Sequence, residues 1–323
     1  MTAQHKSANN AGRVPESEGS RIIFRELAAY QNEVEAAIKN TSADVAELRA
    51  FAEELVASAA GLVSKHRAEL AKQADISAFS TSKSSAVDPV TVVDQACEVS
   101  LVNAIEQRRP LDGIIGEEGA NKPSRSGLSW VIDPIDGTVN FMYGVAEYAV
   151  SVAVVAGEIC LAGAVINIPR NELYSAAAGQ GATVRHADGS VEILESRSEA
   201  NPAMSLIATG FGYGEQRRFH QARLLTTLLP QVRDIRRMGS AALDLCRVAE
   251  GTVDAYYEHG IKLWDVAAGA IIALEAGCWI CLPETLWEPG HDSGRDIVWT
   301  SSAALAERFE ALLIDAHGCT LSQ

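Results

Sequence analysis

Apolar residues return every three or four positions over two long stretches near the start of the chain. The first stretch runs from about Ala43 to Leu70 and the second from Val92 to Arg108. This spacing places the apolar side chains on one face of a helix and predicts two amphipathic helices. Residues 1–20 are rich in Ser, Asn and Gly and show no apolar periodicity, so we expect no regular structure there.

Shorter apolar runs follow, with the length of strands. The runs from Gly113 to Gly116 and from Trp130 to Ile132 are predicted to be buried strands, and acidic residues follow each of them directly. Residues 148–178 form three apolar runs separated by turn sequences at residues 157–158 and 169–171. This stretch therefore predicts an antiparallel sheet.

Strands and helices alternate after about residue 200. We expect strands at residues 205–208, 253–257 and 296–300, and helices at 216–229, 240–249, 264–275 and up to about 315. Gly251 and Gly277 follow two of the predicted helices, as glycine commonly does at a helix end. The pattern predicts a layered α/β structure.

The chain has 323 residues, which suits one large domain or two closely packed halves at roughly 150 residues per domain. We expect residues 1–40 to be an N-terminal extension, either disordered or an additional helix. An α+β half over residues 41–195 would carry Glu117, Asp133 and Asp136, most of the acidic candidates for binding a metal, and an α/β half over residues 196–323 would complete the site with Asp265. The predicted fold class is α/β, in the wider sense that includes α+β.

Composition narrows the classes of partner. The chain has 27 Lys and Arg residues against 42 Asp and Glu residues, a formal net charge of −15, and no strong basic patch stands out. This balance disfavours nucleic acid and anionic lipid as partners. We expect neither a membrane span nor a signal peptide, and the six scattered cysteines are typical of reduced thiols. The expected location is cytoplasmic.

Carboxylates gather at three points where an apolar element ends. Glu117 and Glu118 follow the sequence GIIG, Asp133 and Asp136 lie within WVIDPIDGT, and Asp265 lies within LWDVAAG. Each group by itself is typical of a solvated loop or a helix cap. Together they can converge on one cleft, because charged side chains at the ends of elements leave the core apolar.

The middle group carries the most specific signal. Pro134 stiffens the backbone between the two aspartates, and Gly137 and Thr138 offer backbone N–H groups at a predicted helix N-terminus. Such N–H groups suit a phosphate. Carboxylates suit hard cations such as Mg²⁺, and paired ions can activate water and stabilise a leaving oxygen.

Other chemistries find less support. The seven histidines show no pair at metal-ligand spacing, which disfavours a zinc hydrolase. Cys278 and Cys281 have no second pair and lie in a predicted strand, where residues three apart face opposite sides, so we expect them in the core. The glycines between Gly210 and Gly214 match no nucleotide-binding motif, so a phosphate-adjacent or structural turn is expected there. There is no nucleophile elbow, and His259 is interpreted as a surface or packing histidine.

The sequences GEEGA, WVIDPIDGTVNF and LWDVAAGAIIALEAG, in this order, resemble the inositol monophosphatase family of metal-dependent sugar-phosphate phosphatases. KSSAVDPVTVVD, NELYSAAAGQGA and GSAALDLCRVAEGTVDAYYEHG extend the similarity to about residues 43–315. Within the family the chain is most similar to bacterial inositol-1-monophosphatases of the actinobacterial type. The resemblance implies a layered αβαβα sandwich and a homodimer.

The resemblance also implies a metal site with two to three Mg²⁺ ions. Glu117, Asp133 and the carbonyl of Ile135 would hold one ion. Asp133, Asp136 and Asp265 would hold a second, and Glu117 with water a third.

The catalytic and substrate-binding roles that the resemblance implies concern neighbouring residues. Glu117 and Thr138, the latter paired with Asp94, would orient the attacking water, and the N–H groups of Gly137 and Thr138 would bind the phosphate. No phosphoenzyme is expected, and lithium is expected to inhibit. The residues implied to bind ring hydroxyls are Asp136, the backbone from Gly239 to Ala241, and Glu258.

Three residues near the predicted site allow two interpretations each. Glu118 can act directly or satisfy backbone groups, Asp94 can act directly or cap a helix, and Lys83 can act directly or be a loop charge. Pro89 and Val139 depart from the family pattern, which affects fine specificity more than chemistry.

Hydrolysis of myo-inositol 1-phosphate is the function that the resemblance favours. Alternatives within the same chemistry are a histidinol-phosphate phosphatase and a broader sugar or nucleotide phosphatase, although Glu258 and the EHGIKLWD segment resemble the inositol branch. An alternative from another class is a protein that interacts with the transcription machinery. The intact carboxylate set argues against a purely structural role, because crowded like charges without cations cost stability.

Overall fold

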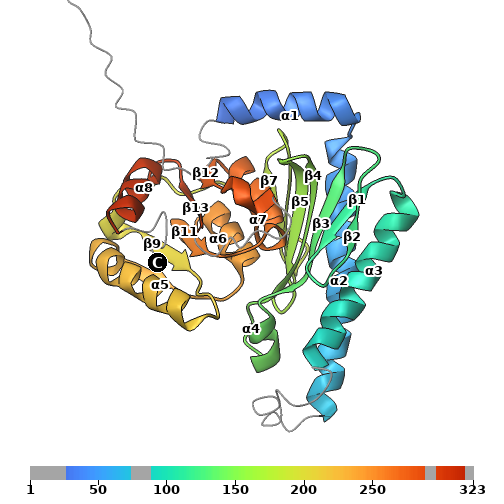
Figure 1. Cartoon of the computed structure of the whole chain (residues 1–323), viewed down its shortest axis with the longest axis horizontal. Helices are drawn as coiled ribbons and strands as arrows, with labels where there is room; N and C mark the ends of the chain where they lie inside the picture. The colour runs from blue at the N-terminus through green and yellow to red at the C-terminus, as the bar shows by residue number, and fades with distance from the viewer. Residues whose placement is uncertain (1–26, 74–88, 288–295, 317–323) are drawn as a thin grey trace, which may run out of the picture.

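Figure 1 shows the computed structural model, which describes residues 27–73, 89–287 and 296–316. Two mixed β-sheets alternate with layers of helices. The helices are α1 (Leu27–Thr41), α2 (Val45–Gln73), α3 (Pro89–Arg108), α4 (Thr138–Tyr143), α5 (Glu215–Leu228), α6 (Ala241–Glu250), α7 (Leu263–Glu275) and α8 (Ala306–Asp315), with short 3₁₀ turns at Pro202–Met204, Leu229–Gln231 and Glu284–Trp287.

The larger sheet has eight strands in the order β2-β1-β3-β4-β5-β6-β7-β8. Strands β1 and β3 run parallel, and the other neighbours run antiparallel. The strands are β1 (Gly113–Gly116), β2 (Asn121–Lys122), β3 (Ser129–Asp136), β4 (Ala149–Ala156), β5 (Ile159–Asn167), β6 (Glu172–Ala177), β7 (Ala182–Arg185) and β8 (Val191–Ile193).

The smaller sheet has five strands in the order β10-β9-β11-β13-β12. Strand β9 runs parallel to both β10 and β11, whereas β13 runs antiparallel to β11 and β12. The strands are β9 (Leu206–Thr209), β10 (Asp234–Arg236), β11 (Ala255–His259), β12 (Cys278–Cys281) and β13 (Ile297–Ser302).

The layers follow the predicted αβαβα order. Helices α2 and α3 cover the outer face of the larger sheet, and α6 and α7 fill the space between the two sheets (Figure 1). Helices α5 and α8 cover the far side of the smaller sheet, where Leu224 and Phe309 share an apolar cluster with Ile207 and Trp299. Each sheet thus buries both faces, which explains the long apolar runs in the central strands.

Helix α7 packs directly against strand β5. A Cβ atom on Gly163 of β5 would lie 2.9 Å from Cα of Ala268, so glycine permits this close approach. The packing matters for function because the first turn of α7 carries Asp265. Burial of small residues thereby sets the position of a charged side chain at the helix end.

The predicted elements agree with the structure in type, and most of their ends shift by one to three residues. Strand β11 extends to His259, two residues beyond the predicted end, so Glu258 lies within the strand. The predicted strand at 130–132 is longer and runs over Ser129–Asp136. Helix α1 provides the additional helix that was one alternative for the N-terminal extension. Residues 1–26 of that extension lie outside the described residues.

Four strands were not predicted, namely β2, β7, β8 and β10. Strands β8 and β10 have only three residues each, too few to show the apolar alternation that predicts a half-buried strand. Both lie at the edge of a sheet. Among the described residues, no helix is both long enough and apolar enough to cross a membrane.

Candidate active site

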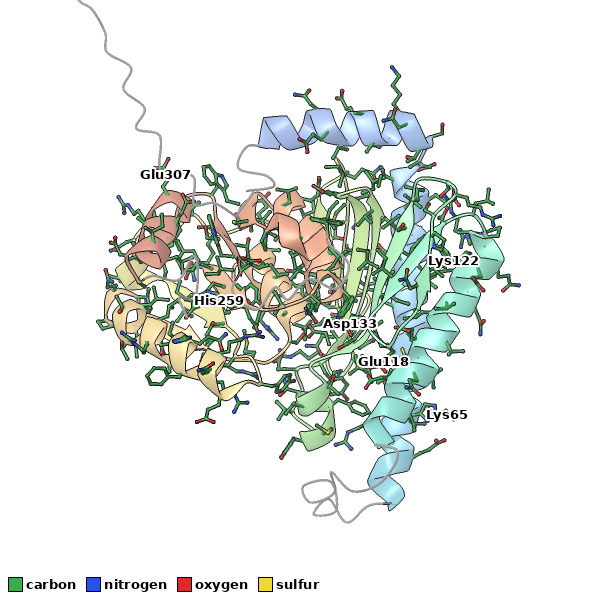
Figure 2. All side chains as sticks on the ribbon, in the orientation of Figure 1. Lys65, Glu118, Lys122, Asp133, His259 and Glu307 are labelled. Carbon is green, nitrogen blue, oxygen red and sulfur yellow. The ribbon has the colours of Figure 1, made fainter. Side chains whose placement is uncertain are left out.

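The site begins where the parallel pairing between strands β1 and β3 ends. Gly116 of β1 pairs with Ile132 of β3, and the N–H of Glu117 donates to the Ile132 carbonyl at 3.3 Å. The next residue after each of these two is acidic, so Glu117 and Asp133 lie side by side where the pairing between β1 and β3 ends. Figure 2 shows Asp133 near the middle of the molecule, between the two halves.

A β-bulge brings the two aspartates of the middle group into one cluster. Asp133 pairs with Ser151 and Asp136 with Ala149, so three steps on β3 face two steps on β4. In a regular strand, side chains three positions apart point to opposite faces. The extra residue corrects this difference, and both carboxylates reach the same cleft.

Asp265 completes the acidic cluster from the other half of the chain. It lies in the first turn of α7, and its Oδ2 accepts a hydrogen bond from the backbone N–H of Lys262 at 2.5 Å. One carboxylate oxygen from each of Asp133, Asp136 and Asp265 lies within 4.8 Å of the others. The structure therefore brings together three of the predicted metal ligands, with Glu117 beside Asp133.

Crowding and burial keep these carboxyl groups partly protonated in the absence of cations. Loss of hydration raises the pKa of Glu117 to about 7 and that of Asp136 to about 6. The pKa values of Asp133 and Asp265 are raised well above the ordinary range, by burial first and then by their acidic neighbours. The cluster thus has a strong electrostatic preference for positive charge.

The donor set fits a hard divalent cation. All four side chains offer oxygen, which such cations prefer. Oδ1 of Asp133 accepts from the Ile135 N–H at 3.0 Å, but its buried Oδ2 accepts no hydrogen bond from any described residue. An orphaned carboxylate oxygen in a group of like charges is costly unless a cation binds it.

Beside the carboxylates, the next wall of the cleft begins at Gly137. Its φ of 88° lies in the left-handed region that favours glycine, and α4 starts at the next residue. The Thr138 hydroxyl donates to the Ile135 carbonyl at 3.1 Å. The predicted helix N-terminus at Gly137 and Thr138 is confirmed, and it lies beside the carboxylates.

Asp136 also joins the two halves of the chain. Its Oδ2 accepts from the Ser240 hydroxyl at 2.5 Å and from the Ala242 N–H at 2.7 Å. These donors lie at the N-terminus of α6, where a carboxylate is favoured by the helix dipole. The backbone around Ser240 was predicted to bind substrate, but the contact of its side chain with Asp136 was not predicted, although a serine after Gly239 and before an apolar helix is a typical N-cap signal.

Glu258 lies on β11 and faces the cleft from the second half. The Tyr256 hydroxyl donates to its Oε2 at 2.9 Å, and burial raises the pKa of Glu258 to about 7. A Cβ atom on Gly210 would collide with the Glu258 carboxyl group. The glycine-rich turn is therefore needed to admit this carboxylate.

These residues surround a cleft of about 430 Å³. Nearly all of the predicted site residues line it, namely Glu117, Asp133, Ile135, Asp136, Gly137, Thr138, Gly239, Ala241, Glu258 and Asp265. Sequence reasoning missed several further lining residues, including Tyr213, Arg217, Arg237, Lys262 and Trp264. Tyr213, Lys262 and Trp264 lie in segments that the sequence had singled out, the glycine-rich turn and EHGIKLWD, but were given no role there. Arg217 and Arg237 lie in no motif.

Other singled-out residues lie elsewhere. Asp94 is buried but does not line the cleft. The prediction that it could cap a helix was wrong, because α3 begins at Pro89 and Asp94 lies inside it. Its pairing with Thr138 stays a prediction.

His259 is buried and lines the cleft, so it is not a surface histidine. Cys278 and Cys281 are buried in β12, which confirms the packing interpretation. Lys83 lies outside the described residues.

Glu98 supports the turn that carries Glu117 and Glu118. Its buried carboxylate accepts from the N–H of Glu118 and from the N–H of Ala120, both at 2.8 Å. A Cβ atom on Gly116 would collide with it. The sequence offered one clue to this role of Glu98, because it lies one helical turn after Asp94 and on the helix face that also carries Leu101.

Comparison with known proteins agrees with this geometry. The model of the inositol monophosphatase family matches residues 44–316. The inositol-1-monophosphatase of Mycobacterium leprae is 44% identical over 284 residues, which cover 85% of this chain and 96% of that protein. The solved structure of Mycobacterium tuberculosis SuhB is similar with a TM-score of 0.72 and 42% identity, over 85% of this chain and 99% of that chain.

One similar relative is not named as a phosphatase. The Nus factor SuhB of Pasteurella multocida is 40% identical over 203 residues, which cover 62% of this chain and 74% of that protein. The family match nevertheless spans both sheets and every carboxylate of the cluster. The chain belongs to the inositol monophosphatase family.

Proposed function

We propose that the chain hydrolyses myo-inositol 1-phosphate to myo-inositol and phosphate, with two to three Mg²⁺ ions in the acidic cluster. The observation that carries this proposal is the cluster of Asp133, Asp136 and Asp265 beside the start of α4. Members of this family are phosphatases, and relatives named inositol-1-monophosphatase are 44–47% identical. The substrate and the identity of the metal are the proposed part.

The roles of the chain's own residues follow from their positions. Glu117, Asp133, Asp136, Asp265 and the Ile135 carbonyl would hold the cations. Bound Mg²⁺ would lower the pKa of a coordinated water and neutralise charge on the phosphate oxygens.

The Glu117 carboxylate, the Thr138 hydroxyl and the backbone N–H groups of Gly137 and Thr138 would act on the reacting atoms. Glu117 lines the cleft beside Asp133, where its carboxylate would orient the attacking water and accept its proton, with the Thr138 hydroxyl helping to orient the water. The N–H groups of Gly137 and Thr138 would donate to the phosphate oxygens. Water attacks phosphorus, the bond to the alcohol oxygen breaks, and no covalent enzyme intermediate forms.

Substrate recognition would involve the second half of the chain. Glu258 can accept hydrogen bonds from ring hydroxyls, and the backbone at Gly239 and Ala241 faces the same cleft. Asp136 lies between the phosphate side and this side. A polyol phosphate therefore fits the arrangement of an acidic cluster on one wall and hydrogen-bonding groups on the other.

The test is Mg²⁺-dependent phosphate release, compared by kcat/KM for inositol 1-phosphate, histidinol phosphate, fructose 1,6-bisphosphate and 3′-phosphoadenosine 5′-phosphate. We expect a clear preference for inositol 1-phosphate that disappears with chelator. Preference for histidinol phosphate would retain the chemistry and overturn the substrate. Absence of hydrolysis with all four would overturn the phosphatase itself.

A role in transcription is the second candidate, because relatives at 40% identity are named Nus factor SuhB. Retention of transcription proteins in a pulldown with both the wild type and Asp133→Asn would support a binding role separate from hydrolysis. A pulldown that recovers none of them would argue against it.

Inhibition by lithium and a homodimeric state are further expectations, testable by inhibition kinetics and by sedimentation.

A further inference from the structure

The two halves of the cleft meet at a direct contact between Gly137 and Gly239. A Cβ atom on Gly137 would lie 2.9 Å from the Glu147 carbonyl oxygen and 3.2 Å from the Gly239 carbonyl oxygen. Both glycines have positive φ values, 88° and 99°. Three separate backbone segments therefore pack together with no room for a side chain.

Asn140 bonds two of these segments together. Its side-chain Nδ2 donates to the Glu147 carbonyl and to the Met238 carbonyl, both at 2.7 Å. Asn140 is buried and lies on α4, and a Cβ atom on Gly239 would lie 2.8 Å from its Nδ2. One amide group thus holds the residue before Gly239 against the helix that begins after Gly137.

The Glu147 side of this junction is itself anchored. The Glu147 carboxylate accepts from Arg247 of α6 at 2.6 Å and from Arg170 at 2.9 Å. The Arg247 and Glu147 side chains are only 10% and 14% exposed, so this ion pair lies largely outside solvent screening. Asn140 consequently donates to a fixed carbonyl on one side and to the segment that leads to Gly239 on the other.

We infer that Asn140 is a positioning residue, which sets the alcohol-binding backbone at Gly239 relative to the phosphate-binding backbone at Gly137. The inference rests on the proposed function, which gives those two backbones their roles. Asn140 does not line the cleft, so it acts through Gly239 and not on the substrate. The metal ligands are held by other contacts, including the hydrogen bonds that Asp133 and Asp265 accept from backbone N–H groups.

The experiment measures kcat and KM of Asn140→Ala with two substrates and saturating Mg²⁺. Inositol 1-phosphate reaches both backbones, whereas phenyl phosphate has no hydroxyl group for the Gly239 side. Thr300→Val is the matched control, because it removes a buried 2.7 Å hydrogen bond from a side chain to the Trp279 carbonyl and does not line the cleft. Asn140→Ser is a milder variant for the case that the alanine variant does not fold.

We expect Asn140→Ala to raise KM for inositol 1-phosphate by about tenfold to a hundredfold, the scale on which small misplacements act, with kcat changed less than about threefold. Both constants for phenyl phosphate should stay within about threefold, as should those of Thr300→Val with either substrate. Unchanged constants with inositol 1-phosphate, or equal losses with both substrates, would overturn the inference. Absence of phosphate release by the wild type would instead overturn the proposed function.

Discussion

The Ser240 hydroxyl donates a 2.5 Å hydrogen bond to Oδ2 of Asp136, 104 positions earlier in the chain. The same hydroxyl oxygen accepts from the Leu243 N–H at 3.3 Å and thereby caps α6. One side chain thus caps the N-terminus of a helix in one half and holds a candidate metal ligand of the other half. The chemistry of the cleft depends on this seam between the halves.

Replacing Ser240 with alanine should weaken both functions of the hydroxyl. Loss of a cap and of a hydrogen bond to a buried carboxylate costs about 1–3 kcal/mol in unfolding free energy. The pKa of Asp136 should rise further, because Ser240 is the largest of the interactions that lower it. Urea unfolding and Mg²⁺ titration measure the two effects.

Ser205→Ala is a suitable control for that variant, because Ser205 is buried and donates to the Asn201 carbonyl at 3.0 Å without lining the cleft. It should lower stability and leave Mg²⁺ affinity unchanged. Equal Mg²⁺ affinity in Ser240→Ala and the wild type would contradict the role given to Ser240.

The metal-free protein should become less stable as the pH rises from about 4 to about 7. The pKa of Glu117 rises from 4.5 to about 7 on folding, and that of Asp136 rises from 3.8 to about 6. The folded state therefore binds more protons than the unfolded state in this range, and the unfolding free energy falls as these protons leave. Mg²⁺ should reverse the trend, because it replaces protons in the cluster.

Thermal unfolding from pH 4 to pH 8, with chelator and with Mg²⁺, measures this linkage. The stabilisation by Mg²⁺ should grow with pH. A stabilisation that is the same at pH 4.5 and pH 7.5 would show that the carboxyl groups are not the site of binding.

Glu98→Gln should lower activity through the turn that holds Glu117. The glutamine offers one acceptor oxygen in place of two, and its amide would face a backbone N–H that now donates to Glu98. We expect kcat to fall at least about tenfold, since misplaced catalytic groups cost this much or more. Glu106→Gln on the same helix is the control, because its ion pair with Lys122 is exposed and contributes little. Similar kcat values for the two variants would refute the assignment.

Gly210→Ala should impair recognition of the alcohol without impairing the chemistry. The added methyl group would collide with the Glu258 carboxyl and displace it. KM for inositol 1-phosphate should rise by about tenfold, whereas hydrolysis of phenyl phosphate should be nearly unchanged. Gly214→Ala is a matched control, because a Cβ atom there meets no atom within 4 Å. Loss of activity toward both substrates in Gly210→Ala would argue against a role of Glu258 in specificity.

The sequence predicted the site residues better than the way they come together. Burial on both sheet faces produces unbroken apolar runs, so the acidic residues that follow the runs in β1 and β3 were visible as candidates. The bulge between Asp133 and Asp136 was not, because the partner strand and its register create it. By regular strand geometry these two side chains would point to opposite faces.

Contacts between distant segments were equally hidden. Asn140 and Glu98 are polar residues in helices, and the sequence does not show that they bond to backbone groups 98 and 20 positions away. Edge strands β8 and β10 were missed because three residues are too few to show an apolar alternation. Apolar periodicity therefore predicts the layers, while tertiary contacts decide the geometry of the site.

The most direct test of the central claim measures phosphate release from inositol 1-phosphate by the wild type and Asp133→Asn, each depleted with chelator and then titrated with Mg²⁺. Asp133 lies at the centre of the cluster, and its substitution removes a buried charge whose repulsion the fold must otherwise bear. We predict that Mg²⁺ restores activity to the wild type. Asp133→Asn should fold normally and remain slower by about three orders of magnitude or more. Near-normal, Mg²⁺-dependent turnover by Asp133→Asn, or turnover by the wild type that ignores the chelator, would contradict the account.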